Sequence, residues 1–365
     1  MENTVALALS LLVLGQVFLS VSLLTARIRE AQTYLPLMMF FLASGLIAVG
    51  PVVTVFAPTY YTAHLSILPP LFLMLGPVFW LYSEGLMSET RWRLRTVHFW
   101  HYVPVLLGCI ATGLIMSMSI ETRELIFVGG ATEDLFIGTG DTLHFPGFVV
   151  IYLFLILLLW LGQSAFYVQR TFRRLSQYKT RLKDVFSNTE KRDLGWVTVI
   201  LWVVGGAWLV FFLSLIADNF LEYQLLSQSA GSVLWLLIVW SLSVWGLRQK
   251  PGFEGEYLKE SSRGSEIDMQ APKYSRSALA DDQAGRIAKK IHASMEGDEL
   301  YLDPNLSLQK LAKHVAVTPN HISQTLNDKM GMNFFDYVNG WRIDAAKPLI
   351  EAGEETVLAV AFAVG

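Results

Sequence analysis

The sequence predicts an all-α protein, in which a seven-helix transmembrane bundle is followed by a smaller soluble helical domain. Apolar residues make up 53 % of the chain and charged residues only 16 %, with a mean hydropathy of +0.42, which departs from typical globular composition. The apolar residues gather in seven stretches near the ~20 residues that cross a bilayer as a helix. Beyond them the chain becomes polar and then regains helical periodicity.

The seven predicted spans lie within residues 1–247, which we interpret as one transmembrane domain. They are residues 5–24, 34–55, 65–82, 97–118, 145–168, 196–217 and 224–247. The first stretch lacks a preceding basic segment and a small-residue cleavage site. We therefore interpret it as a span and not as a cleaved signal peptide.

Basic residues in the connections predict the orientation. Eight Lys or Arg lie in residues 170–192, after the fifth span, and further arginines follow the first and third spans. The alternate connections hold a single basic residue, Arg123, among several acidic residues. Because cytoplasmic loops are enriched in Lys and Arg, we expect the N-terminus outside and the C-terminus inside.

The span centres contain no Asp, Glu, Lys or Arg, which disfavours a transporter or channel. We expect their main polar residues, Gln16 and Gln163, to form interhelical hydrogen bonds. Pro69–Pro70 and Gly76–Pro77 predict a kink in the third span, acting either as a hinge or as a packing bend.

Motifs of enzymes are absent from the sequence. It contains no phosphate-binding glycine loop, nucleophile elbow or HExxH spacing, and its histidines lack partners at metal-ligand spacing. We expect no enzymatic activity, no cofactor and no metal. The lone cysteine, Cys109, excludes an intramolecular disulfide.

Residues 248–280 are rich in Gly, Ser and charged residues and predict a polar linker. Residues 281–365 then predict a soluble helical domain. Its first helix has apolar residues at Ile287, Ile291 and Met295, one on each turn.

Two short helices separated by a tight turn are predicted next. Ser307 is a plausible N-cap for a helix that buries Leu308, Leu311, Ala312 and Val315. After the turn at Ala316–Val317, Thr318 caps a second helix with Pro319 in its first position.

The second helix has an apolar face, Ile322 and Leu326, and a polar, largely uncharged opposite face. This pattern is typical of the recognition helix of a helix-turn-helix, whose Asn and Gln side chains pair with adenine in the major groove. The candidate DNA-binding residues are Thr318, Asn320, His321, Ser323, Gln324 and Asn327. A pair of amphipathic helices that docks a protein has the same periodicity, so that alternative stays open.

The stretch LSLQKLAKHVAVTPNHISQTLNDKMGMNFFDYVNGWRIDAAKPLI, residues 306–350, resembles the first half of an AraC-type DNA-binding domain, and MEGDELYLDPNLS, residues 295–307, resembles the segment that leads into it. LPPLFLMLGPVFWLY (68–82), RTVHFWHYVP (95–104) and YKTRLKDVFSNTEKRDLGWV (178–197) resemble AraC-type regulators with multi-span N-terminal sensors. The resemblance covers nearly the whole chain. It implies a transcription regulator in a bacterial-type inner membrane, with base contacts at Asn320, Ser323 and Gln324 and a long helix at residues 334–350 joining two helix-turn-helix units.

The chain departs from that pattern in three places. Ala316 replaces the usual turn glycine, and Pro348 interrupts the long connecting helix, where a proline costs about 3 kcal/mol unless a kink accommodates it. Residues 354–365 resemble the start of the second unit and stop before its recognition helix. From the sequence we therefore expect a fragment or a truncated product.

The charge of the soluble domain is unusual for a DNA-binding surface. Residues 283–365 contain eight Lys or Arg against ten Asp or Glu, whereas phosphate contacts need a basic face. We expect a local basic face and weak, salt-sensitive affinity. The basic residues available for it are Lys310, Lys313, Lys329, Arg342 and Lys347.

The expected partners are double-stranded DNA, the lipid bilayer, an unidentified small-molecule or membrane signal, and a second copy of the chain in a homodimer. In this interpretation the signal shifts the bundle between two arrangements. The basic residues 170–192 either pass the change to the soluble domain or anchor on anionic lipid headgroups. The alternative function is a seven-span receptor whose cytoplasmic tail docks a protein instead of DNA.

Overall fold

The computed structural model describes residues 2–129, 145–190, 192–220, 228–253 and 281–365. Within them the chain is all-helical, and its one extended pairing is an isolated antiparallel bridge between Phe186 and Ser307. Contacts divide the chain into two compact units. One combines Met1–Arg174 with Leu194–Tyr257, and the other combines Leu175–Asp193 with Leu258–Gly365.

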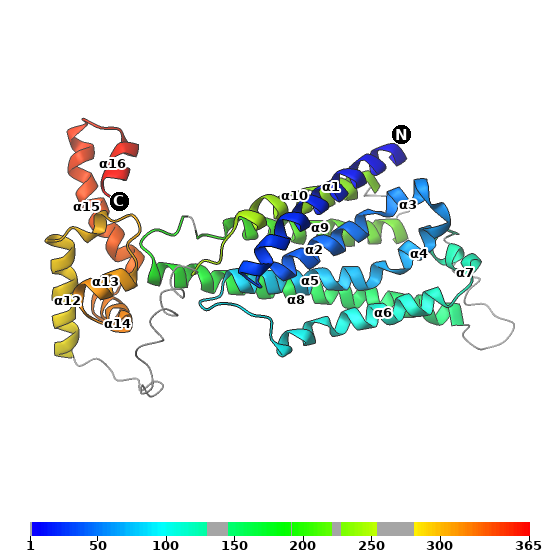
Figure 1. Ribbon diagram of the computed structural model, residues 1–365, viewed down its shortest axis with the longest axis horizontal. Coiled ribbons are helices and arrows are strands. Elements are labelled where there is room, and N and C mark those ends of the chain that lie inside the picture. Colours follow the sequence, from blue (N-terminus) through cyan, green and yellow to red (C-terminus); the bar gives the residue numbers. More distant parts are fainter. Residues whose placement is uncertain (1, 130–144, 191, 221–227, 254–280) are drawn as a thin grey trace. The chain divides into compact units, whose positions relative to one another are not determined.

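The first unit consists mainly of long apolar helices that lie side by side (Figure 1). Its helices are α1 (Glu2–Glu30), α2 (Tyr34–Ala48), α3 (Gly50–Phe56), α4 (Tyr61–Ser66), α5 (Leu68–Leu86), α6 (Val103–Met116), α7 (Ile120–Glu124), most of α8 (Phe145–Val185), α9 (Gly195–Phe220) and α10 (Gln228–Ser241). α1 packs against α2 and α10, α2 against α5, and α5 against α6. Leu73, Ala111 and Ile156 form a small core where α5, α6 and α8 meet.

Four helical segments of the described chain are long and apolar enough to cross a membrane. They are Thr4–Glu30, Tyr34–Phe56, Thr96–Met116 and Phe145–Val185, at the first, second, fourth and fifth predicted spans. The helix pair Pro58–Ser66 and Leu68–Leu86 is a fifth candidate, at the third. The apolar parts described at the sixth and seventh, Gly195–Ala207 and Ala230–Gly246, are shorter. Several helices could therefore span a membrane, whereas a bundle of seven spans stays a prediction.

The bend in the third predicted span lies before its prolines. Pro58–Ser66 and Leu68–Leu86 meet at 48° around Ile67, and α5 then begins with Pro69 in its first turn, where a missing N–H breaks no helical hydrogen bond. α5 continues through Pro77 as a helix up to Leu86. The expected kink is thus present, but at the start of α5.

Polar side chains in these helices join neighbours, as predicted from the sequence. The Gln163 Nε2 donates to the backbone carbonyl of Leu73 at 3.0 Å, and the Gln16 Nε2 donates to the Ser243 hydroxyl. Large apolar side chains face outward at the same time, with Phe18 77 % and Trp202 71 % exposed. Such an exposed apolar surface suits contact with lipid.

The second unit packs short amphipathic helices around one core. Its elements are the end of α8 with the segment that follows it, α12 (Asp281–Glu296), a 3₁₀ turn (Leu300–Leu302), α13 (Leu308–Val315), α14 (Pro319–Met330), α15 (Phe334–Ala352) and α16 (Val357–Ala363). Ile287, Ile291 and Met295 are buried, as predicted, and pack with α13, α14 and α15. α15 forms the long helix expected at residues 334–350 and continues through Pro348.

The domain boundaries expected from the sequence, 1–247, 248–280 and 281–365, stay predictions. Most of the linker, residues 254–280, lies outside the described residues. The division into compact units differs from those boundaries in one respect. Leu175–Asp193, which lies inside the expected transmembrane domain, belongs to the C-terminal unit.

Candidate nucleic-acid interface

α13 begins and packs as its sequence predicts. The Ser307 Oγ accepts a hydrogen bond from the Lys310 backbone N–H at 3.3 Å, which satisfies one of the free amides of the first turn. All four apolar residues of the predicted face are buried: Leu308, Leu311, Ala312 and Val315. One side of this helix is therefore fixed against the core.

The turn between the two helices has the geometry that a glycine usually provides. Ala316 has φ 56° and ψ 46°, in the left-handed region, where a Cβ lies too close to the following carbonyl oxygen. The next residue, Val317, donates its backbone N–H to the Ala312 carbonyl at 3.0 Å and packs partly against the core. Ala316, which stands where the turn usually has a glycine, therefore adopts the left-handed conformation at the cost of backbone strain.

α14 has the predicted cap and the predicted inner face. The Thr318 Oγ1 accepts from the His321 backbone N–H at 3.3 Å, and Pro319 occupies the first turn. Ile322 and Leu326 are fully buried, together with Thr325. The orientation of the helix about its own axis is therefore set by this buried side.

The six candidate DNA-binding residues lie together at the start and on the outer side of α14. Thr318, Asn320 and Asn327 are exposed, whereas His321, Ser323 and Gln324 are partly buried. The Asn327 Nδ2 donates weakly to the Ser323 Oγ at 3.4 Å, and the Thr318 hydroxyl is used in capping. This surface offers amide, hydroxyl and imidazole groups, and none of its six residues is Asp, Glu, Lys or Arg.

The basic face expected beside it is weaker than predicted. The Lys310 Nζ lies 2.7 Å from the Asp303 Oδ2, and the Lys347 Nζ lies 2.7 Å from the Asp344 Oδ1. Although burial acts to raise it, the pKa of Asp303 is lowered by hydrogen bonds from Lys310 and from the Asn305 backbone N–H. Two of the five expected cations are therefore partly neutralised by neighbouring carboxylates.

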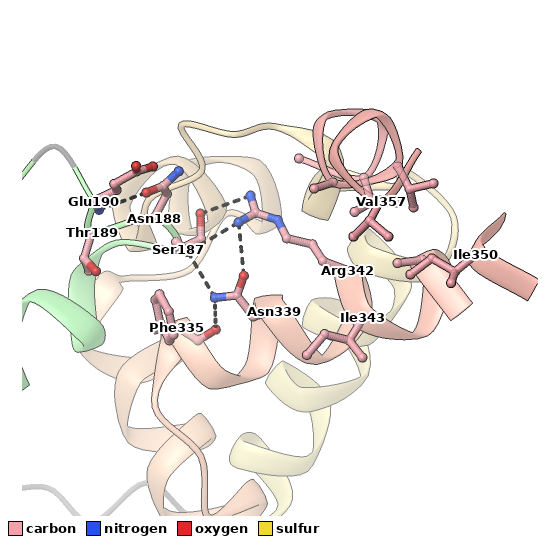
Figure 2. A pocket seen from close by; sticks show the side chains of 15 residues that line it. Ser187, Asn188, Thr189, Glu190, Phe335, Asn339, Arg342, Ile343, Ile350 and Val357 are labelled. Atoms are coloured by element: carbon pink, nitrogen blue, oxygen red, sulfur yellow. Dashed lines mark hydrogen bonds between the residues drawn. The ribbon is translucent and has the colours of Figure 1, made fainter. Parts of the chain in front are cut away.

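The expectation for Arg342 is wrong. This side chain is only 6 % exposed, and its guanidinium points toward Ser187 and Asn339 (Figure 2). The Arg342 Nε donates to the Tyr301 carbonyl at 2.8 Å, and the Arg342 Nη2 donates to the Asp303 carbonyl at 2.9 Å. Burial lowers the pKa of Arg342 against the opposing effect of Asp303. Arg342 is thus a structural residue and not a phosphate contact.

The remaining donors of Arg342 hold the segment that follows α8. The Arg342 Nη1 donates to the Ser187 carbonyl at 3.3 Å, and the Arg342 Nη2 donates to the Ser187 Oγ at 3.4 Å (Figure 2). The Asn339 Nδ2 also donates to the Ser187 carbonyl, at 3.1 Å. Ser187 itself is 1 % exposed. One arginine of α15 therefore joins three stretches of chain that are far apart in the sequence.

Residues 186–190, which we call the strap, also contact the start of α13. The Ser187 backbone N–H and hydroxyl both donate to the Leu306 carbonyl, at 3.2 and 2.8 Å. Phe186 is buried and forms the antiparallel bridge with Ser307, the N-cap of α13. The strap and α15–α16 enclose an open groove of about 460 Å³, with Ile343 and Val357 on its apolar side (Figure 2).

The sequence does not predict the pairing of Ser187 with Arg342, Asn339 and Leu306. The only signal there is the polar run Ser187-Asn188-Thr189, which indicates a helix end. Nothing in a local pattern links it to residues more than 100 positions away.

No protein-family model matches this chain, and neither a curated protein nor a solved structure shows significant similarity to it.

Proposed function

We propose that this chain is a membrane-anchored, sequence-specific DNA-binding transcription regulator that couples a signal at its apolar helices to a helix-turn-helix in its C-terminal unit. One observation carries the proposal. The same chain joins helices of membrane-spanning length to a capped, tightly turned helix pair whose second helix has a polar outer side. The resemblance of residues 306–350 to AraC-type domains points to the same function.

In this proposal α14 enters the major groove with its N-terminal half. Asn320 and Gln324 would pair with adenine through their amides, and Ser323 would contact either base type. Their side chains start from a helix whose rotation is fixed by the buried Ile322 and Leu326. Because few unpaired cations flank α14, we expect a modest affinity that falls as salt is raised.

The test uses the full chain reconstituted in lipid nanodiscs. Duplexes selected from a random pool by the reconstituted protein are footprinted, and their affinity is measured for Gln324→Ala. The matched control is Gln283→Ala, the same change on the exposed face of α12. We expect Gln324→Ala to weaken binding by about 1–3 kcal/mol and relax the preference at one base pair. Equal affinities of the two variants, or no protected bases with any duplex, would contradict the proposal.

We place the apolar helices in a bacterial-type inner membrane, with the N-terminus outside and the C-terminal unit in the cytoplasm. The support is the length of the helices and the basic residues 170–192, because cytoplasmic connections are enriched in Lys and Arg. The signal would be a small molecule or a change in the membrane, and a second copy of the chain would occupy a second half-site. Reporter fusions in the connecting segments test this orientation.

A second candidate function is supported by the apolar surface of α16. Val357, Leu358 and Phe362 are 69, 67 and 81 % exposed, and such a surface suits docking of a protein. In that case the chain is a multi-span receptor whose C-terminal unit binds a protein partner. Capture of DNA and protein from membranes, with and without Gln324→Ala, separates the two functions. Loss of DNA alone supports the regulator, and a protein capture that ignores α14 but is lost in Phe362→Ser supports the receptor.

A further inference from the structure

Arg342 uses its side-chain donors to connect separate segments of the chain, and we call this set of hydrogen bonds the Arg342 clamp. A guanidinium has five N–H donors, and five hydrogen bonds from Arg342 are present, to Tyr301, Asp303, Asn339 and two atoms of Ser187. None of these acceptors is a carboxylate, and the side chain is buried. With its donors used in this way, Arg342 has none left for a phosphate or another anion in the groove. Its role is therefore to hold chain segments together.

What the clamp holds is the strap, and the strap is the direct continuation of α8. α8 runs without interruption from Phe145 to Val185, so its first part belongs to the apolar unit and its end to the C-terminal unit. Lys183, on its last turn, also lies over the ring of Phe335 at 5.5 Å. The strap thus attaches the end of a predicted membrane span to α13 and α15.

Within the C-terminal unit, the strap lies against the start of α13 and against α15, and none of its hydrogen-bond partners is on the outer side of α14. Its partners are the Leu306 carbonyl, the N-cap residue Ser307 and the inner side chains Asn339 and Arg342. The core cluster that runs from Ile287 to Val338 contains no residue of the strap, although Phe186 of the strap is itself buried. Release of the strap would therefore expose Phe186 but leave the residues of this cluster packed on one another.

We propose that the strap, docked on Arg342, holds the start of α13 and α15 in the arrangement that binds DNA, and that its release switches this binding off. This inference rests on the proposed function and names its regulation. Movement of α8 is carried into the strap through unbroken helix. It then reaches α13 through the Ser187–Leu306 hydrogen bonds, and α15 through the Arg342 clamp.

The test compares two release variants with one control in the full chain in nanodiscs. Ser187→Pro removes the N–H and the hydroxyl that donate to Leu306. Arg342→Lys keeps the positive charge but loses the planar fork that reaches several carbonyls at once. The control, Glu190→Ala, changes an exposed residue of the same strap. Hydrogen exchange and affinity for a selected duplex are measured for all of them.

For the release variants we expect amide exchange at residues 306–311 to rise at least about tenfold, because each variant loses at least one hydrogen bond of a charged or buried group. The amides of Ile322 and Leu326 should stay protected. DNA affinity should fall about as much, because the competent arrangement is populated less. The control should match the unmodified chain in both measurements.

Each other outcome is decisive. Unchanged exchange at residues 306–311 would show that the strap is not docked, and raised exchange with unchanged or tighter DNA binding would show that docking does not regulate. If the unmodified chain binds no duplex at all, the proposed function fails and the regulation of DNA binding fails with it. Exchange alone then still reports whether the strap is docked, so the two failures are distinguishable.

Discussion

Ala316 is a position where a smaller side chain should stabilise the protein. Its φ of 56° and ψ of 46° lie in the left-handed region, which costs an L-residue with a Cβ roughly 1–2 kcal/mol. Glycine avoids that cost, but its unfolded chain is more flexible, which offsets about 0.4–1 kcal/mol. Ala316 is exposed, so no packing is lost. We therefore expect Ala316→Gly to stabilise the C-terminal unit by about 0.5–1 kcal/mol.

The measurement is native-state hydrogen exchange in the full chain, read at the amides of Ile322 and Leu326 in α14. A gain near 1 kcal/mol slows exchange about fivefold. The matched control is Ala293→Gly, an identical change at an exposed position inside α12, which should speed exchange because glycine costs about 1 kcal/mol in a helix interior. If both variants changed exchange in the same direction, the left-handed turn at Ala316 would be refuted.

Three further predictions concern other parts of the chain. Pro348→Ala should stabilise α15 by about 1–3 kcal/mol, because a helix-interior proline lacks its N–H and crowds the preceding turn. Amide exchange in α15 should become slower, and faster exchange would contradict the prediction. Gly108→Ala should destabilise the packing of α5 and α6 by about 1–3 kcal/mol, since a Cβ there lies 2.7 Å from proline backbone atoms of α5. In the control, Gly113→Ala, the added Cβ meets nothing within 4 Å. Thermal unfolding in detergent compares the two variants, and equal unfolding midpoints would argue against the close approach. The pKa of Asp303 is lowered from its ordinary value of 3.8, so the stability that its carboxylate contributes is complete above that value and is lost as the pH falls through the lower folded pKa. Asp303→Asn should therefore reduce the loss of exchange protection on acidification below about pH 4. Lys310→Met should bring the pKa of Asp303 closer to its ordinary value.

The sequence alone determined the elements whose signals are local. The membrane-length helices follow from uninterrupted apolar stretches, because a bilayer requires a fixed length of apolar helix. In the C-terminal unit, Ser307, Thr318 and Pro319 marked the helix starts, since capping depends on a residue and its next three neighbours. The inward side of α14 followed from the helical period at Ile322 and Leu326. The helix starts and the buried side of α14 were confirmed, because each depends on residues a few positions apart in the same helix.

Tertiary structure decided what local periodicity does not encode. Arg342 looked like a surface cation, but packing buries it and directs its donors to backbone carbonyls on other segments. No local pattern around Ser187 indicates that it lies against Leu306, 119 positions away. The close approach of α6 to α5 at Gly108 likewise depends on which helices meet. Sequence patterns report a residue's own helix face, whereas the partner of a buried polar group is fixed only when distant segments pack together.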